Sequence, residues 1–538
     1  MAQQCVNVAD YLLEGKELDR IALQFLSHDV SYGRLKVVAQ AVAGYLLHIG
    51  SAKGDRVVLL GDNSFFWVAA YLGIMRAGLV CVPLPADVSA PDFNDIRRSI
   101  DARVLFAEAS AASRLRDHLN GLNLITDRAL SSLPYIGSQI SLLAIELQPR
   151  PSVLRASPAA GDDLAALMFT SGSTGRPRGV MVSHANIIAN TESIVEYLRL
   201  TNDDRVMSIL PFHYCFGASL LHTHLRVGGS LVIDPRFAYP EVLLRRMRDT
   251  RCTGFAGVPS HYQILLRRSS LKTKTFPDLR YVQQAGGHLA PTFARELREA
   301  LPATEIFVMY GQTEATARLA YLPPHLFGEK VGSIGKAIPG VKLMVLNESG
   351  EQVQVGEVGE IVAEGANVTH GYWGDAVETA KSFRAGKLFT GDLATVDSEG
   401  YIFIADRVKS FLKCGGRRVS TRQLEELMLE LHALQEVAVI GIQDDVLGEA
   451  VKAFVVPRNS NLSDLENRLL QHCRERMPQE FIPKQIVVLD GLPKNSTGKV
   501  LKANLNELEL RASVKSQPVP YNGRKLVRES RQVRNPMG

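Results

Sequence analysis

The chain has 538 residues, of which 46% are hydrophobic and 22% charged, a composition typical of folded globular proteins and unlike that of disordered or fibrous ones. Its length favours at least two domains. The formal charge of +5 arises at the end of the chain, where residues 511–538 carry seven basic side chains against one acidic side chain. The first 510 residues are therefore close to neutral, which argues against a general nucleic-acid surface.

The six cysteines are scattered along the chain, and no two of them form a CxxC pair. This distribution argues against a zinc site or a disulfide framework and suits a reducing compartment. The first residues lack the basic and then apolar pattern of a signal peptide. The most apolar stretch, residues 65–75, is too short to span a bilayer. We therefore expect a cytoplasmic protein.

Segments typical of strands and helices alternate along the first part of the chain. Hydrophobic patterning predicts strands at residues 56–60, 79–84, 164–169, 205–210 and 231–234, with helices at residues 64–76, 184–198 and 219–227. This alternation predicts a large α/β domain with parallel sheets flanked by helices.

Beyond residue 400 the pattern changes to shorter mixed elements. It predicts helices at residues 420–432 and 462–477, and strands at residues 437–442, 451–456 and 485–489. These elements would form a smaller α+β domain of about 100 residues. We predict an N-terminal core domain at residues 1–406, a C-terminal domain at residues 407–510 and a flexible basic tail at residues 511–538.

The strongest motif follows the predicted strand at residues 164–169 and reads TSGSTGRPRG over residues 170–179. Its glycines let the backbone approach an anion closely, and its hydroxyls and Arg178 add donors and positive charge. Clusters of Ser, Thr and Gly are usually only polar loops, but this density after a buried strand predicts a phosphate-binding loop. Its candidate ligands are Thr170, Ser171, Gly172, Ser173, Thr174, Gly175 and Arg178. The Walker A, GxGxxG and GxSxG patterns are absent.

The loop resembles the phosphate loop of the adenylate-forming superfamily, which includes acyl-CoA synthetases, luciferase-like enzymes and the adenylation domains of peptide synthetases. That family normally has lysine where this chain has Arg178, so the positive charge is kept on a different side chain. The resemblance implies that the small C-terminal domain is mobile and that the active site lies at the junction of the two domains.

A second matching segment, residues 310–314 (YGQTE), resembles the family's YGxTE motif. The resemblance implies that Tyr310 stacks near adenine, that Thr313 approaches the α-phosphate and that Glu314 holds Mg²⁺. A carboxylate suits a hard cation that bridges phosphates. Other nucleotide-binding residues implied by the resemblance are Gly286, Gly287, His288, Gly311, Gln312 and Ile404.

Three further matches lie toward the C-terminal end. The TGD sequence at residues 390–392 resembles the family motif whose aspartate, here Asp392, binds both ribose hydroxyls, as a carboxylate can by accepting two hydrogen bonds. Arg407 corresponds to an arginine that contacts the ribose and phosphate, and Lys409 to the hinge between the domains. Residues 492–499 (LPKNSTGK) resemble the motif whose last lysine, here Lys499, reaches the substrate carboxylate and the α-phosphate.

The resemblance implies an AMP-forming ligase that converts a carboxylic acid and MgATP to an acyl-adenylate and pyrophosphate, and then transfers the acyl group to a thiol. Residues 211–215 (PFHYC) resemble the acyl-pocket segment of acyl-CoA ligases, and the aspartate that amino-acid-activating domains carry near His213 is missing. A fatty or other uncharged acyl acid is therefore favoured, with coenzyme A as the thiol. The candidate catalytic residues are Lys499, Thr313, Glu314 and His213.

Other interpretations stay open. The enzyme would alternatively load an amino acid or acyl acid onto a separate carrier protein, whose typically acidic surface would suit the basic tail. A non-catalytic relative would be expected to have damaged motifs, yet Glu314, Asp392, Arg407 and Lys499 are all present. A light-emitting oxygenase on the same fold is suggested by residues 406–413 (DRVKSFLK), although most relatives with such a segment are plain ligases. No nucleic-acid partner and no membrane span are expected.

Overall fold

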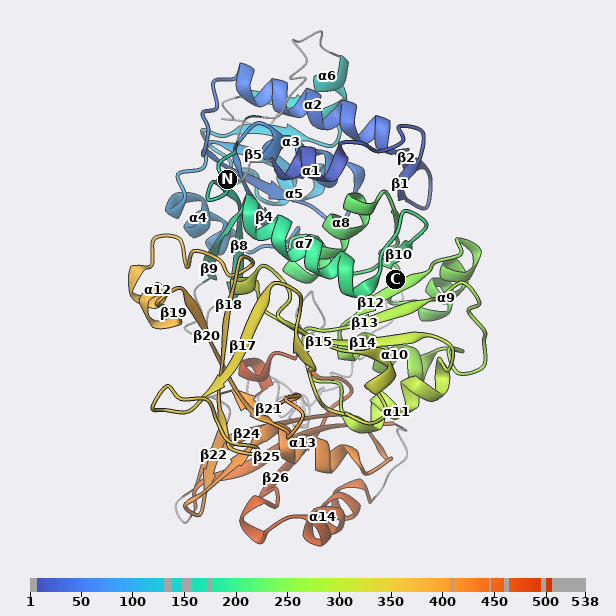
Figure 1. Ribbon diagram of the computed structural model, residues 1–538, viewed down its shortest axis with the longest axis vertical. Helices are drawn as coiled ribbons and strands as arrows, with labels where there is room; N and C mark the ends of the chain where they lie inside the picture. The colour runs from blue at the N-terminus through green and yellow to red at the C-terminus, as the bar shows by residue number, and fades with distance from the viewer. Residues whose placement is uncertain are drawn as a thin grey trace, which may run out of the picture.

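The computed structural model describes residues 7–129, 138–147, 157, 159–171, 177–407, 411–444, 447–458, 464–494 and 500–505. Their strands form four sheets, two of them large (Figure 1). The predicted architecture is confirmed, with a large α/β part that contains parallel sheets followed by a smaller α+β part.

The first large sheet has seven strands. Their spatial order is β7 (Ser138–Ser141), β6 (Asn123–Thr126), β5 (Val104–Ala107), β3 (Arg56–Leu60), β4 (Val80–Leu84), β8 (Leu164–Ser171) and β9 (Pro177–Ser183). Neighbouring strands are parallel except β8 and β9, which form an antiparallel hairpin. The strand predicted at residues 56–60 is confirmed, and the one predicted to end at residue 169 continues to Ser171. The predicted phosphate loop therefore begins inside a strand.

The second large sheet has nine strands. Their order is β16 (Lys336–Ala337), β15 (Ala320–Leu322), β14 (Glu305–Tyr310), β13 (Tyr281–Gln284), β12 (Gly254–Gly257), β10 (Arg205–Ser208), β11 (Ser230–Ile233), β1 (Ile21–Gln24) and β2 (Asp29–Ser31). The strands from β14 through β1 are mutually parallel, and antiparallel pairs close both edges. The carboxyl ends of the central strands therefore meet at one edge, where ligands of open α/β sheets bind.

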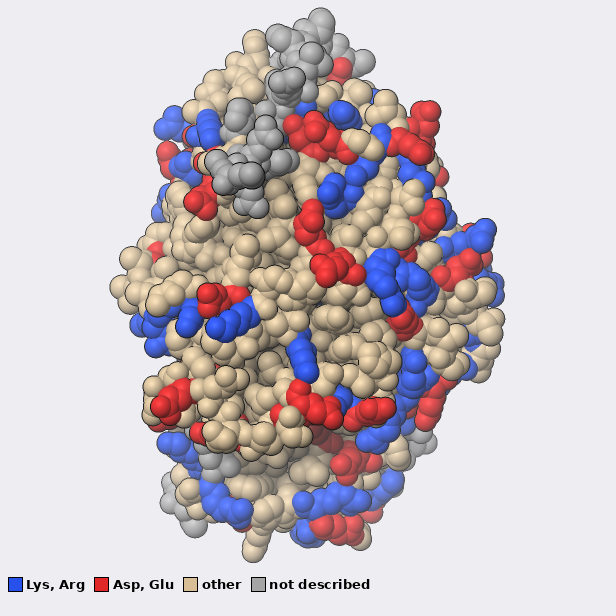
Figure 2. Space-filling model, in the orientation of Figure 1, with Lys and Arg blue, Asp and Glu red and all other residues tan. Residues whose placement is uncertain are grey.

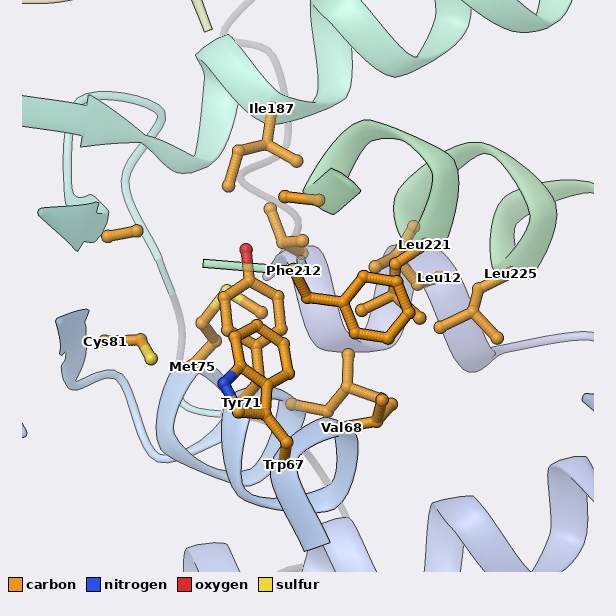
Figure 3. Packing of buried hydrophobic residues seen from close by; sticks show 14 of the residues in the cluster. Leu12, Trp67, Val68, Tyr71, Met75, Cys81, Ile187, Phe212, Leu221 and Leu225 are labelled. Carbon is orange, nitrogen blue, oxygen red and sulfur yellow. The ribbon is translucent and has the colours of Figure 1, made fainter. Parts of the chain in front are cut away.

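Helices from distant parts of the chain pack together in the largest hydrophobic core, which also includes residues from both large sheets. These helices are α1 (Val8–Leu13), α2 (Tyr32–His48), α3 (Phe65–Arg76), α7 (His184–Leu198) and α8 (Cys215–Val227). Figure 3 shows Trp67 and Tyr71 of α3 stacked beside Phe212, with Ile187 of α7 opposite the tyrosine. The helix predicted at residues 184–198 is confirmed. The remaining helices of this part are α4 (Ala90–Ser99), α5 (Ala109–Arg114), α6 (Leu142–Leu147), α9 (Pro240–Asp249), α10 (Pro259–Arg268) and α11 (Pro291–Ala300).

Helix α8 begins one turn earlier than the predicted start at residue 219. In the structure Gly217 lies inside the first turn of the helix, where a Cβ atom would lie 2.0 Å from the carbonyl oxygen of Pro211. The glycine therefore permits close packing of the helix on the preceding loop and does not interrupt it.

An antiparallel sheet that the sequence analysis did not predict follows the second large sheet. Its strands are β17 (Val341–Leu346), β18 (Gly359–Gly365), β20 (Lys387–Val396) and β19 (Phe383–Arg384), and β21 (Ile402–Arg407) pairs with β20. Helix α12 (Ala376–Ser382) connects β18 and β19 in the chain. Many residues of these strands are only partly buried, so the hydrophobic pattern that reveals a buried strand is weak here.

The C-terminal part has its own sheet and its own core. Its strands are β23 (Arg417–Ser420), β22 (Phe411–Cys414), β25 (Gly448–Pro457), β24 (Leu434–Asp444) and β26 (Gln485–Val488), accompanied by α13 (Thr421–Leu429) and α14 (Leu465–Arg476). It lies beyond β21 at the lower end of the molecule (Figure 1). The three predicted strands are present. β24 and β25 are longer than expected, whereas β26 ends one residue before the predicted end at residue 489 and α13 three residues before the predicted end at residue 432.

The visible surface carries both signs of charge. Figure 2 shows acidic and basic side chains interspersed over this face, without a dominant region of one sign. Within the described residues, no helix combines the length and the apolar character needed to cross a membrane.

Candidate active site

Four neighbouring parallel strands bring three predicted segments, together with residues 258–259, to one edge of the second large sheet. Residues 211–215 follow β10, residues 258–259 follow β12, residues 285–288 follow β13, and residues 310–314 begin at the end of β14. Because these strands are parallel, all four segments lie at their carboxyl ends. The sheet topology thus brings together motifs that are separated by about 100 positions in the chain.

The predicted adenine and ribose residues are in direct contact. The Tyr310 hydroxyl donates a hydrogen bond of 2.6 Å to Oδ2 of Asp392. Asp392 lies in β20, opposite Arg407 of β21, and the backbone N–H of Gly391 donates to Oε1 of Glu360 at 2.8 Å. Both Tyr310 and Asp392 are buried. The third sheet is therefore joined to the second at the position expected for a nucleoside.

Thr313 and Glu314 lie in a short 3₁₀ turn, Thr313–Ala315, directly after β14. The Thr313 hydroxyl contacts Sγ of Cys215 at 3.5 Å, a contact that sequence analysis missed because the two residues are 98 positions apart. Burial raises the pKa of the Cys215 thiol, so the sulfur is uncharged at neutral pH. A Cβ atom on Gly311 would lie 2.0 Å from the carbonyl oxygen of Ala317, so this glycine lets the turn close.

Glu314 is held at its side chain and at its backbone. Its Oε1 accepts a hydrogen bond of 2.8 Å from the hydroxyl of Tyr372, and its carbonyl oxygen accepts from the N–H and hydroxyl of Thr369 at 3.0 and 2.9 Å. Burial and the neighbouring carboxylate raise the pKa of Tyr372, so the phenol keeps its proton and acts as a donor. Sequence analysis missed Tyr372, and nothing in the local pattern of residues 371–373 distinguishes it.

A magnesium ion fits this carboxylate. Mg²⁺ is usually bound by one or two carboxylates together with substrate phosphates. Glu314 offers one such group, and within the described part of the chain no partner is recorded for its Oε2. The same part of the chain contains no cluster of three or more His, Cys, Asp or Glu side chains that would hold a metal ion by itself.

Arg178 of the predicted phosphate loop makes contacts with protein carboxylates. It lies opposite Thr170 in the β8–β9 hairpin. Its Nη1 is 2.8 Å from Oε2 of Glu378, and its Nε is 4.0 Å from Oδ2 of Asp375. Six predicted site residues fall outside the described residues: Gly172, Ser173, Thr174, Gly175, Lys409 and Lys499. Ser171 and Arg407 are described for their backbone strands only.

His213 follows β10 in a loop anchored by Asn63. The Asn63 side chain accepts from the N–H of Phe212 and donates to the carbonyl of Leu210, both at 2.8 Å. Desolvation lowers the pKa of His213 to about 4, so the imidazole is neutral at physiological pH.

A cavity of about 20 Å³ is lined by Cys215 together with Tyr71 and His222, and it has room for about one water molecule.

The structure places His288 against the C-terminal part of the chain. Its Nδ1 accepts from Nη2 of Arg422 at 2.5 Å, and its Nε2 lies 2.6 Å from Oε1 of Glu426. The neutral tautomer that accepts at Nδ1 and donates at Nε2 satisfies both partners, and burial lowers the pKa of His288. Arg422 also donates to the carbonyl of Ile404 at 2.8 Å, so α13 bridges two predicted nucleotide residues.

The two glycines before His288 allow the turn after β13 to approach the turn after β12 closely. Gly286 has a φ of +81°, and its Cβ atom would lie 3.0 Å from Cγ1 of Val258. A Cβ atom on Gly287 would lie 3.3 Å from Pro259. The turn after β13 therefore packs on the turn after β12, with little space for larger side chains.

Of the C-terminal motif at residues 492–499, the structure describes residues 492–494. Lys494 pairs with Val500 in an antiparallel bridge, and its ammonium is 2.8 Å from Oε2 of Glu436. Desolvation lowers the pKa of His261 in α10 to about 4, and the positive charge of Lys494 contributes to that shift. Lys494 thus lies within electrostatic range of α10, the helix that follows β12.

Comparisons with known proteins identify the family of the chain. Residues 13–373 match the profile of the family described as AMP-binding enzyme, and residues 423–499 match that of the AMP-binding enzyme C-terminal domain. The chain is 29% identical to an indoleacetate–CoA ligase of Aromatoleum aromaticum, over 94% of this chain and 98% of that protein. It is 32% identical to a feruloyl-CoA synthase of an Amycolatopsis species, over 88% and 93% of the two chains.

A solved structure shows the same fold. The crystal structure of the anthranilate CoA ligase AuaEII in complex with anthranoyl-AMP aligns with a TM-score of 0.84 and 26% identity, over 95% of this chain and 98% of that one. The resemblance inferred from the motifs is thereby confirmed. The chain belongs to the AMP-binding enzyme family, within its group of AMP-forming CoA ligases.

Proposed function

We propose that this enzyme uses ATP to convert an uncharged carboxylic acid to an acyl-adenylate and then transfers the acyl group to coenzyme A. The observation that carries the proposal is the convergence of Tyr310, Thr313 and Glu314 with Asp392 at the carboxyl ends of parallel strands. These side chains suit the adenosine and the α-phosphate of one nucleotide. The predicted phosphate loop connects β8 and β9, and its residues 172–176 lie outside the described residues.

In the first half-reaction, an oxygen of the substrate carboxylate forms a bond to the α-phosphorus of ATP, and the bond to the bridging oxygen of pyrophosphate breaks. Negative charge develops on the phosphoryl oxygens. Thr313 donates a hydrogen bond there, and Lys499 contributes a positive charge. Glu314 would hold Mg²⁺, which neutralises phosphate charge when it is bound. Asp392 and Tyr310 position the nucleoside.

The acid is proposed to be uncharged in its acyl part. His213 is neutral at physiological pH because desolvation lowers its pKa to about 4, so it offers no charge to a substrate ammonium or carboxylate. The two relatives above are named for indoleacetate and a feruloyl group, and the related crystal structure contains anthranoyl-AMP. Fatty acids and aryl acids are therefore the first substrates to test.

In the second half-reaction, the thiolate sulfur of coenzyme A attacks the acyl carbonyl carbon, and AMP leaves with the bonding electrons. We propose that the C-terminal domain rotates about Lys409 between the two half-reactions. Lys409→Pro should then leave adenylate formation intact and block thioester formation. Equal loss of both half-reactions would contradict the hinge assignment.

The proposed function is tested by ATP–pyrophosphate exchange with fatty acids, aryl acids and the proteinogenic amino acids, followed by thioester assays with coenzyme A. Exchange driven by a fatty or aryl acid, and a thioester formed on coenzyme A, are the expected results. Exchange driven only by an amino acid, or transfer only to a carrier protein, would contradict the substrate or the acceptor. No exchange with any acid would contradict the activity itself.

Lys499 is tested by its replacement with alanine. We expect adenylate formation to fall by about 100-fold, because one preorganised charge on the developing oxyanion is lost. Lys484→Ala is the matched control, because Lys484 is exposed on the same domain and pairs with Asp444. A Lys499→Ala enzyme with unchanged exchange rates would remove the lysine from the catalytic set.

A further inference from the structure

The guanidinium of Arg178 is directed toward helix α12 and the segment that precedes it. Nη1 is 2.8 Å from Oε2 of Glu378, the third residue of α12, and Nε is 4.0 Å from Oδ2 of Asp375. The Arg178 side chain is only 17% exposed, so this ion pair is shielded from water on most sides. The interaction is correspondingly stronger than a surface pair.

The same guanidinium lies near the ring of Tyr372. Its Cζ atom is 5.7 Å from the ring centroid, within the range of a cation–π interaction. The backbone fixes the two elements together, since Val180 pairs with Tyr372 and the N–H of Trp373 donates to the carbonyl of Gly179 at 2.8 Å. The segment around residue 372 is thus held along β9.

Tyr372 connects this cluster to the predicted metal ligand. Its hydroxyl donates to Oε1 of Glu314 at 2.8 Å, while Thr369 holds the backbone carbonyl of Glu314. Rotation of the carboxylate would break the phenol hydrogen bond. With Oε1 occupied in this way, Oε2 is the oxygen available to a cation within the described structure.

We propose that Arg178 and Glu378 are positioning residues that act through Tyr372 to orient the Glu314 carboxylate, and thereby set the affinity of the enzyme–nucleotide complex for its divalent cation. This inference rests on the proposed function, because it takes Glu314 as the metal ligand. It differs from the simpler role expected for Arg178, which is a direct contact with the phosphates. A role in orienting Glu314 predicts weaker metal binding with unchanged nucleotide affinity in EDTA. A direct phosphate contact predicts weaker nucleotide binding even without metal.

The inference is tested by binding of Mn²⁺ to the full-length enzyme in complex with α,β-methylene-ATP, followed by electron paramagnetic resonance. This nucleotide cannot release pyrophosphate, so the readout is independent of turnover. We expect Tyr372→Phe and Glu378→Gln to weaken Mn²⁺ binding about tenfold, as loss of a group that orients a metal ligand commonly does. Affinity for the nucleotide in EDTA should stay unchanged in both variants.

Matched variants separate the contribution of the Arg178–Glu378 ion pair from that of the Lys381–Glu378 ion pair. Lys381→Ala is the control, because Lys381 is an exposed partner of Glu378, at 2.6 Å, and does not contact Tyr372 in the described structure. It should bind Mn²⁺ like the wild type. The exchanged pair Arg178→Glu with Glu378→Arg should recover Mn²⁺ affinity relative to Arg178→Glu alone. Melting temperatures of all variants show whether each protein is folded.

Opposite results would overturn the inference. Wild-type Mn²⁺ affinity in Tyr372→Phe, or weaker nucleotide binding in EDTA for Glu378→Gln, would show that the cluster acts on the phosphates or on the fold. Failure of the proposed function is distinguished by the wild-type enzyme, which would then catalyse no acid-dependent exchange. Glu314→Gln should abolish the Mn²⁺ site, and a retained site would show that the metal ligand is a different residue.

Discussion

At the scale of single residues, Gly217 and Gly311 allow backbone segments to pack closely. Gly311 belongs to the YGQTE segment, yet the structure shows that its lack of a side chain lets the turn approach the carbonyl of Ala317. The same holds for Gly217 against the carbonyl of Pro211. Sequence analysis placed Gly311 among the nucleotide residues because the motif resembled a family segment, and motif resemblance does not separate contact from packing.

Gly311→Ala should therefore reduce both stability and activity. The new methyl group would lie 2.0 Å from the Ala317 oxygen, so the turn that carries Thr313 and Glu314 must shift. We expect a loss of about 1–3 kcal/mol in the free energy of unfolding, as for other overpacked sites. Urea denaturation measures this loss. Gly328→Ala is the control, since nothing lies within 4 Å of its Cβ position, and equal stability of the two variants would refute the packing argument.

At the scale of elements, helix α13 forms the described contact between the C-terminal part and the nucleotide residues. Arg422 in its first turn reaches the ring of His288 and the carbonyl of Ile404, and its Nε donates to Glu426 at 2.9 Å. The resemblance placed His288 beside adenine, and the structure adds this contact with α13. A domain rotation would have to break these hydrogen bonds.

Arg422→Ala should loosen this contact without unfolding either part. Because hydrogen bonds that involve a charged group contribute about 1.5–3 kcal/mol, we expect amide hydrogen exchange in residues 402–407 to become about tenfold faster. Mass spectrometry of the exchanged peptides measures the change. Arg417→Ala serves as control, because Arg417 pairs with Glu480 inside the C-terminal part. Unchanged exchange in Arg422→Ala would show that the contact is energetically negligible.

At the scale of the whole molecule, buried neutral histidines make stability depend on pH. Burial lowers the pKa of His184 and His224 to about 4 and that of His222 to about 3, compared with 6.5 for an exposed histidine. At pH values between about 4 and 6.5, the unfolded chain therefore binds more protons than the folded chain. The contribution of these neutral histidines to stability is fully present above pH 6.5 and is lost as the pH falls toward 4.

The free energy of unfolding should thus fall as the pH is lowered from 6.5 to 4.5, by about 1.4 kcal/mol per pH unit for each histidine that stays neutral. Urea denaturation at several pH values measures the slope. The salt-bridged carboxylates Glu296 and Glu426, with pKa values of about 2, add a further loss only below pH 4.5. A flat profile between pH 4.5 and 6.5 would contradict the assignment of buried neutral histidines.

Much of the fold was predictable from local pattern. The strand at residues 56–60 and the helix at residues 184–198 were predicted at their observed bounds, because a short aliphatic run and a clear helical periodicity are local properties. The antiparallel sheet β17–β21 was missed, because many of its residues are partly exposed and leave no strong hydrophobic pattern. The start of α8 was misplaced because Gly217 permits a contact that no local pattern reveals.

The sequence by itself determined the family, the order of the motifs and the α/β class, because these depend on residue types at fixed short spacings. Only the tertiary structure decided the partners of the site residues. Tyr372 meets Glu314 across 58 positions, Thr313 meets Cys215 across 98, and Arg422 meets His288 across 134. Such contacts depend on which strands become neighbours in a sheet, and that order is set by the packing of the whole chain.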